Sequence, residues 1–114
     1  MTRVVITGAG TINALGHSVP ETLTAMREGR CGIGDLDIRD VDRLLVKIGG
    51  QVQDYDEHAH FNRQQIALYD RFTQFTLLSA REAVAQSGLS FNGDLATRTG
   101  VVLGTSGGGL NTQD

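Results

Sequence analysis

The chain has 114 residues, enough for one small domain, and its 39% hydrophobic and 20% charged residues are those of an ordinary soluble protein. A net charge of −3 and scattered Lys and Arg residues argue against a protein that binds nucleic acid or a membrane surface. No apolar run reaches the roughly 20 residues of a membrane span, and no signal-peptide pattern opens the chain, so we expect a cytoplasmic protein. Cys31 is the only cysteine, which excludes an internal disulfide and a cysteine-based zinc cluster.

A short apolar run near the N-terminus predicts a buried strand over Arg3–Thr7, because its residues do not alternate with polar ones. The glycine-rich turn that follows suggests a dinucleotide site, since Gly8 and Gly10 supply the first half of a G-x-G-x-x-G motif. Asn13 occupies the place of the third glycine, and we see no second strand that ends in an acidic residue about 20 residues later. We therefore expect a tight turn into the first helix and no dinucleotide cofactor.

The segment after this turn predicts a helix from about Val19 to Glu28. Ser18, followed three residues later by Glu21, has the pattern of a capping box at a helix N-terminus. Leu23 and Met26 are expected to face inward, and the glycine that follows the helix is expected to end it.

The stretch from Cys31 to Gln53 is less regular, and only its KIGGQV sequence indicates a short strand. The polar sequence DYDEHAHFNRQQ is predicted to be a loop that turns into a helix. Its carboxylates and imidazoles are the ligand types of zinc and manganese, but they sit together on one loop and no second ligand group has a convincing spacing. We expect a solvated polar loop rather than a metal site; the residues are Asp54, Asp56, Glu57, His58 and His60.

The clearest helix pattern covers YDRFTQFTLLSAREAVAQSG, and Gly88 is expected to end this helix in the left-handed conformation. A second buried strand, Gly100–Gly104, then runs into glycines. Strand, helix, short strand, helix and strand in this order predict an α/β fold, with a layered sheet that contains parallel strands. The inward positions of the long helix are Leu68, Phe72, Phe75, Ser79 and Ala83.

The C-terminal glycines contain a match to the G-x-S-x-G elbow, which presents a nucleophilic serine between a strand and a helix. Ser106 is the candidate nucleophile. A serine nucleophile also needs a histidine and a carboxylate, and in the hydrolase fold both follow the serine, whereas every histidine of this chain precedes Ser106. A serine hydrolase is therefore a remote alternative. Cys31 has no such elbow around it, and we expect a small, partly buried residue there.

Three segments together resemble the β-ketoacyl-acyl-carrier-protein synthases of the thiolase fold. RVVITGAGTINALGHSVPETLTAMREGRCGI is similar to the family's opening, YDRFTQFTLLSAREAVAQSGL to its "MDRFTQ…AAREAL…AGL" helix, and RTGVVLGTSGGGLNT to its strand and glycine turn. The resemblance covers nearly the whole chain in collinear order and implies the N-terminal part of a thiolase-like fold, with a mixed sheet and layered helices. Family members are several times longer, so residues 1–114 are expected to be an incomplete N-terminal half-domain, with no further domain in the chain.

The resemblance implies decarboxylative condensation of an acyl thioester with malonyl-acyl-carrier protein, in fatty acid or polyketide synthesis. In the family a cysteine takes the acyl group and two histidines assist decarboxylation, and all three lie beyond the part that this chain resembles. Cys31, His17, His58 and His60 match none of them. No cofactor and no metal are expected, and the partners are acyl carrier protein, the two thioesters and a second copy in a homodimer. An inactive, chain-length-factor-like partner subunit remains the alternative.

The resemblance also implies two functional surfaces. Gly107 stands where the family often has an Ile or Phe that gates the acyl pocket, and Ser106 and Gly108 would complete this wall. Without a bulky side chain there, the pocket has room for a longer, branched or more rigid acyl chain, unless a neighbouring side chain fills the gap. Family members that elongate fatty acids often have several Lys or Arg just before the long helix, which suits an acidic carrier protein. Here only Arg63 and Arg71 remain, so we expect weaker or different docking, as in a polyketide-type or other specialised synthase or an inactive partner subunit.

Overall fold

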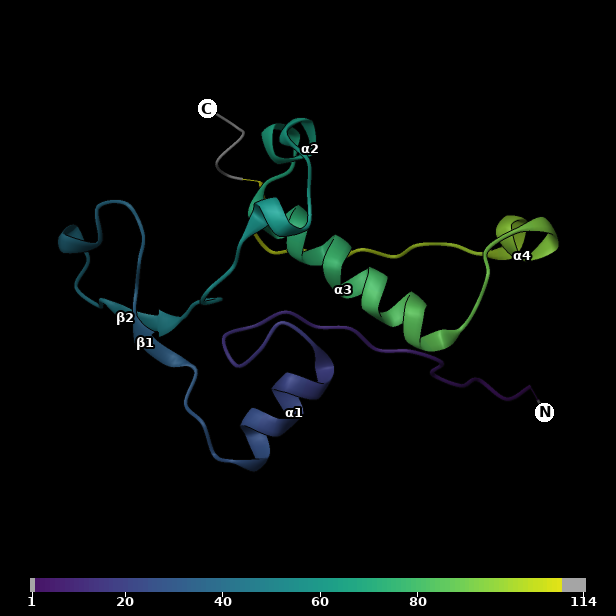
Figure 1. The fold of residues 1–114 in the computed structure, drawn as a ribbon, viewed down its shortest axis with the longest axis horizontal. Helices are drawn as coiled ribbons and strands as arrows, with labels where there is room; N and C mark the ends of the chain where they lie inside the picture. Colours follow the sequence, from purple (N-terminus) through teal and green to yellow (C-terminus); the bar gives the residue numbers. More distant parts are fainter. Residues whose placement is uncertain (1, 110–114) are drawn as a thin grey trace.

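The computed structural model describes residues 2–109 as a chain of helices with one small sheet (Figure 1). The helices are α1 (Val19–Arg27), α2 (Arg63–Leu68), α3 (Arg71–Ser87) and α4 (Gly93–Arg98); the strands are β1 (Ile33–Asp35) and β2 (Ile48–Gly50); the 3₁₀ turns are η1 (Val41–Arg43) and η2 (Glu57–Ala59).

Helix α1 has the ends that its sequence predicts. The Ser18 hydroxyl accepts a hydrogen bond from the Glu21 amide at 3.3 Å, and the Glu21 carboxylate accepts one from the His17 amide at 2.7 Å. The chain leaves the helix at Gly29, which has a φ of 67° and donates to the Met26 carbonyl at 3.2 Å. A left-handed residue in this place is what a glycine tolerates best, so the predicted stop signal is confirmed.

The predicted inward face of α1 is wrong. Leu23 and Met26 are 44% and 62% exposed, whereas Ala25 is fully buried. The reason is that the loop before α1 covers a different side of the helix, where the Asn13 amide group donates to the Thr22 hydroxyl at 3.0 Å. A narrow strip of small side chains is therefore covered in place of the large ones.

The sheet differs from the expected one. β1 and β2 form an antiparallel pair in which Ile33 lies opposite Gly50, and β2 confirms the short strand expected in KIGGQV. The two predicted buried strands, Arg3–Thr7 and Gly100–Gly104, are not strands, and Val102 is 100% exposed. A strand needs a neighbour for its backbone N–H and C=O groups, and within residues 2–109 no strand lies beside either segment.

The long helix α3 lies at the centre of the structure, and the glycine-rich N-terminal segment runs along it (Figure 1). A Cβ atom at Gly8 would collide with the Ala83 carbonyl, and one at Gly10 with the Ser79 carbonyl. The expected tight turn is thus a close backbone-to-helix approach, which glycine on one side and small residues on the other permit. The predicted end of α3 at Gly88 is confirmed by its φ of 65°.

Polar side chains of α3 hold this segment in place. Gln86 Oε1 accepts from the Ala9 amide at 2.6 Å, and the Glu82 carboxylate accepts from the Thr11 amide at 2.9 Å and the Val19 amide at 2.7 Å. Val19 is the first residue of α1, where an amide has no partner within the helix. Glu82 therefore joins the N-terminal segment, the start of α1 and α3.

The start of α3 was predicted too early. The chain breaks between Leu68, the last residue of α2, and Arg71, so Leu68 lies outside the long helix and is 75% exposed. The capping box that begins α2 explains the separate helix, because Asn62 and Gln65 each accept a hydrogen bond from the other's amide, at 2.9 and 3.0 Å.

Few side chains are fully covered in the described part of the chain; the buried ones include Ala25, Phe61 and Gln74. The radius of gyration is 17.1 Å, against about 13 Å for a compact domain of ~100 residues. An open arrangement with exposed apolar segments indicates surface that is suited to be covered by further protein.

Candidate functional site

The glycine turn lies at the C-terminal end of the described residues. The chain bends at Ser106 and Gly107 and turns at Gly108, whose amide donates to the Thr105 hydroxyl at 3.1 Å. Ser106 and Gly107 are exposed, whereas Gly108 is half-buried against the ring of Phe72 on α3. The structure therefore places the three predicted wall residues next to one another but in different surroundings. The last residues of the resembling segment, 110–112, lie outside the described residues.

The structure of this turn also shows whether Ser106 sits on a nucleophile elbow. A nucleophile elbow requires a strand that leads into the turn. Residues 100–105 form neither a strand nor a helix, so the local context that favoured Ser106 is not formed.

A buried polar cluster, which the sequence did not predict, lies beside α3. The Tyr55 hydroxyl donates to Gln74 Oε1 at 2.6 Å, and Gln74 Nε2 donates to the Tyr69 carbonyl at 2.9 Å and to Glu57 at 3.3 Å. Gln74 is 1% exposed, so these bonds satisfy an amide that has no access to water. Burial, and after it the charge of Glu57, raises the pKa of Tyr55 above its ordinary value of 10.0. The signal in the sequence was a glutamine between two phenylalanines of an amphipathic helix.

Aromatic rings extend this cluster. His60 stacks on Tyr55 with 6.0 Å between ring centroids, and Phe75 meets Tyr55 edge to face at 4.9 Å. His17 approaches the same ring at 6.3 Å, with its Nε2 2.7 Å from the Gln53 carbonyl oxygen. The expectation of a solvated polar loop is confirmed for Asp54, Asp56, His58 and His60, which are exposed. Tyr55 is the exception, because its ring packs against Phe75 of α3.

The candidate metal ligands and the cysteine have local structural contacts. Asp56 accepts from the His58 amide at 3.0 Å and caps η2. Between residues 2 and 109, no three His, Cys, Asp or Glu side chains are grouped so that they could hold a metal ion. Cys31, two residues before β1, is exposed rather than partly buried as expected, and its Sγ accepts from the Ile33 amide at 3.4 Å.

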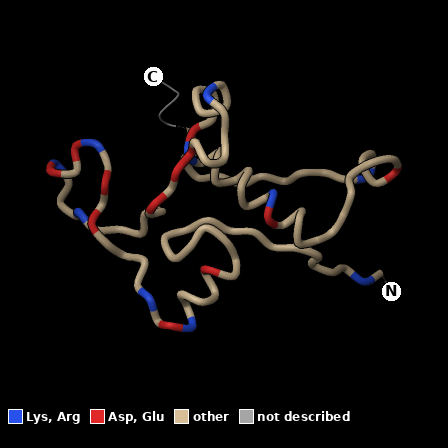
Figure 2. The backbone as a smooth tube through the Cα atoms, in the orientation of Figure 1, with Lys and Arg blue, Asp and Glu red and all other residues tan. Residues whose placement is uncertain are grey.

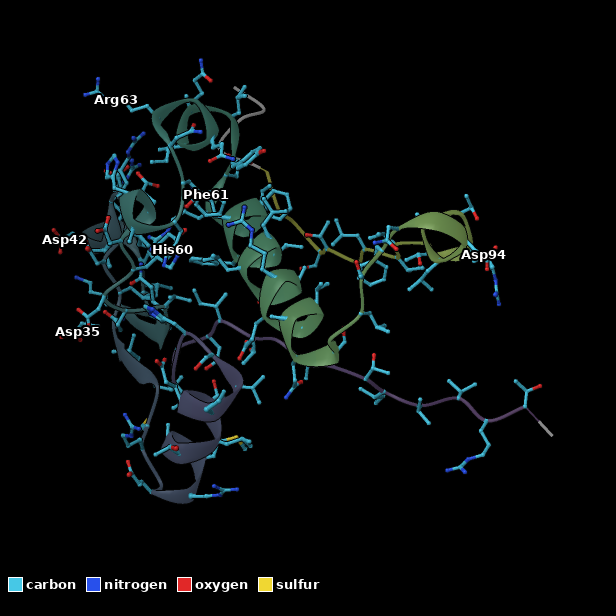
Figure 3. All side chains as sticks on the ribbon, turned by 45° about the vertical axis from the view of Figure 1, so that its right-hand side comes forward. Asp35, Asp42, His60, Phe61, Arg63 and Asp94 are labelled. Atoms are coloured by element: carbon cyan, nitrogen blue, oxygen red, sulfur yellow. The ribbon has the colours of Figure 1, made fainter. Side chains whose placement is uncertain are left out.

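The two candidate docking arginines have different surroundings. The Arg71 guanidinium lies over the Tyr55 ring, 5.4 Å from its centroid, and lines a hollow of about 330 Å³ that Asp37 and Asp54 also line. Arg63 starts α2 and its side chain points outward from the chain (Figure 3). Figure 2 shows acidic residues along the segment that leads to η2, close to the start of α3. Arg71 therefore shares its hollow with carboxylates, whereas the side chain of Arg63 points outward from α2.

Comparison with known proteins identifies the family. Residues 1–114 match the family described as "Beta-ketoacyl synthase, N-terminal domain". The chain belongs to this family. It is 39% identical over 107 residues to nodulation protein E of Rhizobium sp. (strain N33), which covers 94% of the chain and 26% of that protein. It is 34% identical over 110 residues to 3-oxoacyl-(acyl-carrier-protein) synthase 2 of Staphylococcus aureus (strain N315), covering 96% of the chain and 27% of that protein. With the synthase 2 of Synechocystis sp. (strain ATCC 27184 / PCC 6803 / Kazusa) it shares 33% identity over 108 residues, 95% of the chain and 26% of that protein.

This ketosynthase-family chain spans about a quarter of the length of the curated relatives that it matches. The resemblance stated from its three segments is confirmed, because the match covers all of them. Within residues 2–109, no helix combines the length and the apolar character that a membrane crossing requires.

Proposed function

We propose that the chain is the N-terminal part of a β-ketoacyl-acyl-carrier-protein synthase with a thiolase-like fold, residues 1–114 being an incomplete half-domain of it. The observation that carries the proposal is the family match over residues 1–114, together with relatives named 3-oxoacyl-(acyl-carrier-protein) synthase 2. In the reaction an enzyme thiolate takes the acyl group from its carrier. Malonyl-carrier protein then loses CO₂, and its carbanion attacks the acyl carbonyl and expels the thiolate, which gives 3-oxoacyl-carrier protein.

The described residues serve in this proposal as scaffold and pocket wall, while the catalytic cysteine and histidines lie outside the chain. The exposed apolar runs at residues 4–6 and 101–103 support it, since such runs fit strands of a larger mixed sheet. The complete protein is proposed to be a cytoplasmic homodimer that works without a cofactor, in fatty acid or polyketide synthesis.

Acylation of the full-length protein tests this assignment. Incubated with acyl-carrier protein, it should gain the mass of one acyl group, and both Cys31→Ser and Ser106→Ala should keep that gain, because neither residue is the proposed nucleophile. Loss of acylation in Ser106→Ala would favour the serine hydrolase. A protein that stays unacylated alone but stimulates an active synthase would be the inactive partner subunit.

Gly107 is proposed to widen the acyl pocket, with Ser106 and Gly108 beside it. Its position at an exposed bend supports this role, because the bend presents backbone where a larger residue would project a side chain. In the full-length protein, Gly107→Ile should lower kcat/KM for the longest accepted acyl chain by about tenfold or more, since one methylene in a pocket changes kcat/KM by roughly 10–200-fold. An unchanged chain-length profile would contradict the proposed gate.

Arg63 is proposed to be the stronger of the two carrier-docking residues, since its side chain points outward from α2, whereas Arg71 shares its hollow with Asp37 and Asp54. Arg63→Glu should raise KM for acyl-carrier protein roughly threefold and leave kcat unchanged, as expected for a charge at the edge of an interface. Arg27→Glu, at the end of α1, is the matched control. Equal effects of the two substitutions on KM would refute docking through Arg63.

A further inference from the structure

One aromatic ring connects the glycine turn to α3. A Cβ atom added at Gly108 would lie 2.5 Å from Cδ2, 2.6 Å from Cγ and 2.8 Å from Cε2 of Phe72. The Gly108 backbone therefore rests directly on the ring. The φ angle of Gly108 is not positive, so backbone conformation does not demand glycine here. The missing side chain is required by contact with Phe72.

The turn also contains an internal hydrogen bond. The Gly108 amide donates to the Thr105 hydroxyl at 3.1 Å, which closes a loop around Ser106 and Gly107. When Gly108 is displaced, Gly107 is carried with it. Gly108 is half-buried, whereas Gly107 is exposed and remains available for contacts outside the described residues.

We propose that Phe72 is a positioning residue that sets acyl-chain length by fixing how far the glycine turn stands from α3. The proposal rests on the proposed function and extends the acyl-pocket wall to a residue of the long helix. A smaller side chain at Phe72 lets the turn move toward α3 and deepens the pocket beside Gly107. A larger one pushes the turn outward and shortens the pocket. Phe72 itself does not touch the acyl chain.

Chain-length specificity of the full-length protein tests this role. Phe72→Leu should raise the ratio of kcat/KM for a longer over a shorter acyl chain about tenfold, and Phe72→Trp should lower it by a similar factor. Gly108→Ala should act like Phe72→Trp. Combining it with Phe72→Leu should restore the wild-type ratio, because the space left by the ring accommodates the added methyl group. Phe91→Leu, in the segment between the end of α3 and the start of α4, is the matched control.

A second readout does not depend on activity. Amide hydrogen exchange at Gly108 should become about tenfold faster in Phe72→Leu and stay unchanged in Phe91→Leu. Unchanged amide exchange at Gly108 in Phe72→Leu would overturn the positioning role, and this holds whether or not the protein is an active enzyme. A wild-type protein that forms no 3-oxoacyl product would contradict the proposed function, which is a separate result. In an active protein, an unchanged chain-length ratio in both Phe72 variants would equally overturn the positioning role. Gly108→Ala keeps the test decisive if Phe72→Leu fails to fold.

Discussion

Gly10 is a residue at which one methyl group decides whether two segments fit together. Its backbone lies against the Ser79 carbonyl, so Gly10→Ala forces the N-terminal segment away from α3. We expect the free energy of unfolding of the full-length protein to fall by about 3 kcal/mol or more, the upper range for overpacking. Urea denaturation measures this loss. Gly34→Ala is the matched control, because nothing lies within 4 Å of the added atom, and an equal loss there would contradict the close approach.

Tyr55 supplies a hydrogen bond that the buried Gln74 cannot replace with water. Tyr55→Phe leaves Gln74 Oε1 without its donor and should lower the free energy of unfolding by about 1–3 kcal/mol. Tyr69→Phe keeps its edge-to-face contact with Phe61 and should have a much smaller effect. Similar losses in the two variants would show that the hydroxyl of Tyr55 makes no special contribution.

The pKa of Tyr55 also predicts how stability depends on pH. The folded pKa is raised above 10.0, so the unfolded chain loses this proton first as pH rises. The contribution of Tyr55 is therefore fully present below pH 10.0 and is lost as the pH approaches the folded pKa. The loss of stability above pH 10.0 should be shallower in Tyr55→Phe. Denaturation at a series of pH values checks this, and identical slopes for both proteins would contradict it.

At the scale of elements, Glu82 is the carboxylate that joins α3 to the start of α1. Glu82→Gln keeps one acceptor oxygen for two amide donors, those of Thr11 and Val19, and removes a negative charge from a helix N-terminus. We expect a loss of about 1–2 kcal/mol in the free energy of unfolding. Glu28→Gln, whose exposed ion pair with Arg30 contributes little, is the matched control and should change stability by less than about 0.5 kcal/mol. Faster amide hydrogen exchange at Val19 in Glu82→Gln would show that the loss of stability arises at the start of α1.

Local signals predicted the helices better than the strands. The caps at Ser18 and Gly88 lie within their own elements, so the sequence shows where α1 begins and where α3 ends. β1 depends on its pairing with β2, which a three-residue stretch does not reveal, and α4 was also missed. Arg3–Thr7 has the composition of a strand but lacks a neighbouring strand among the described residues.

In the candidate site, too, the sequence predicted the local features but not the contacts between distant residues. The glycine turn and the arginines could be found because family motifs are read along the sequence. The contact between Gly108 and Phe72 and the bond between Tyr55 and Gln74 could not, because each joins residues 19 or more positions apart whose meeting depends on how α3 lies in space. The aromatic ring beneath Arg71, which the sequence singled out only as a docking candidate, could not be predicted for the same reason.

At the scale of the whole molecule, the open shape predicts that apolar segments are covered in the complete protein. Val102 is 100% exposed in residues 2–109, so Val102→Asp would be harmless if that exposure persisted. We expect instead that Val102→Asp lowers the free energy of unfolding by about 3 kcal/mol or more, or makes the protein insoluble, because a buried unpaired carboxylate is costly. Thr97→Asp on α4 is a control outside this apolar run. Solubility and urea denaturation of the full-length variants measure the difference, and an unaffected Val102→Asp protein would contradict a covered strand.

The reaction itself tests the central assignment most directly. Full-length protein is mixed with acyl-carrier protein and malonyl-carrier protein, and CO₂ and carrier-bound products are measured together. A condensing enzyme releases one CO₂ for each 3-oxoacyl-carrier protein formed, and this is the result that we predict. No 3-oxoacyl product, or CO₂ released without a new carbon–carbon bond, would contradict the assignment.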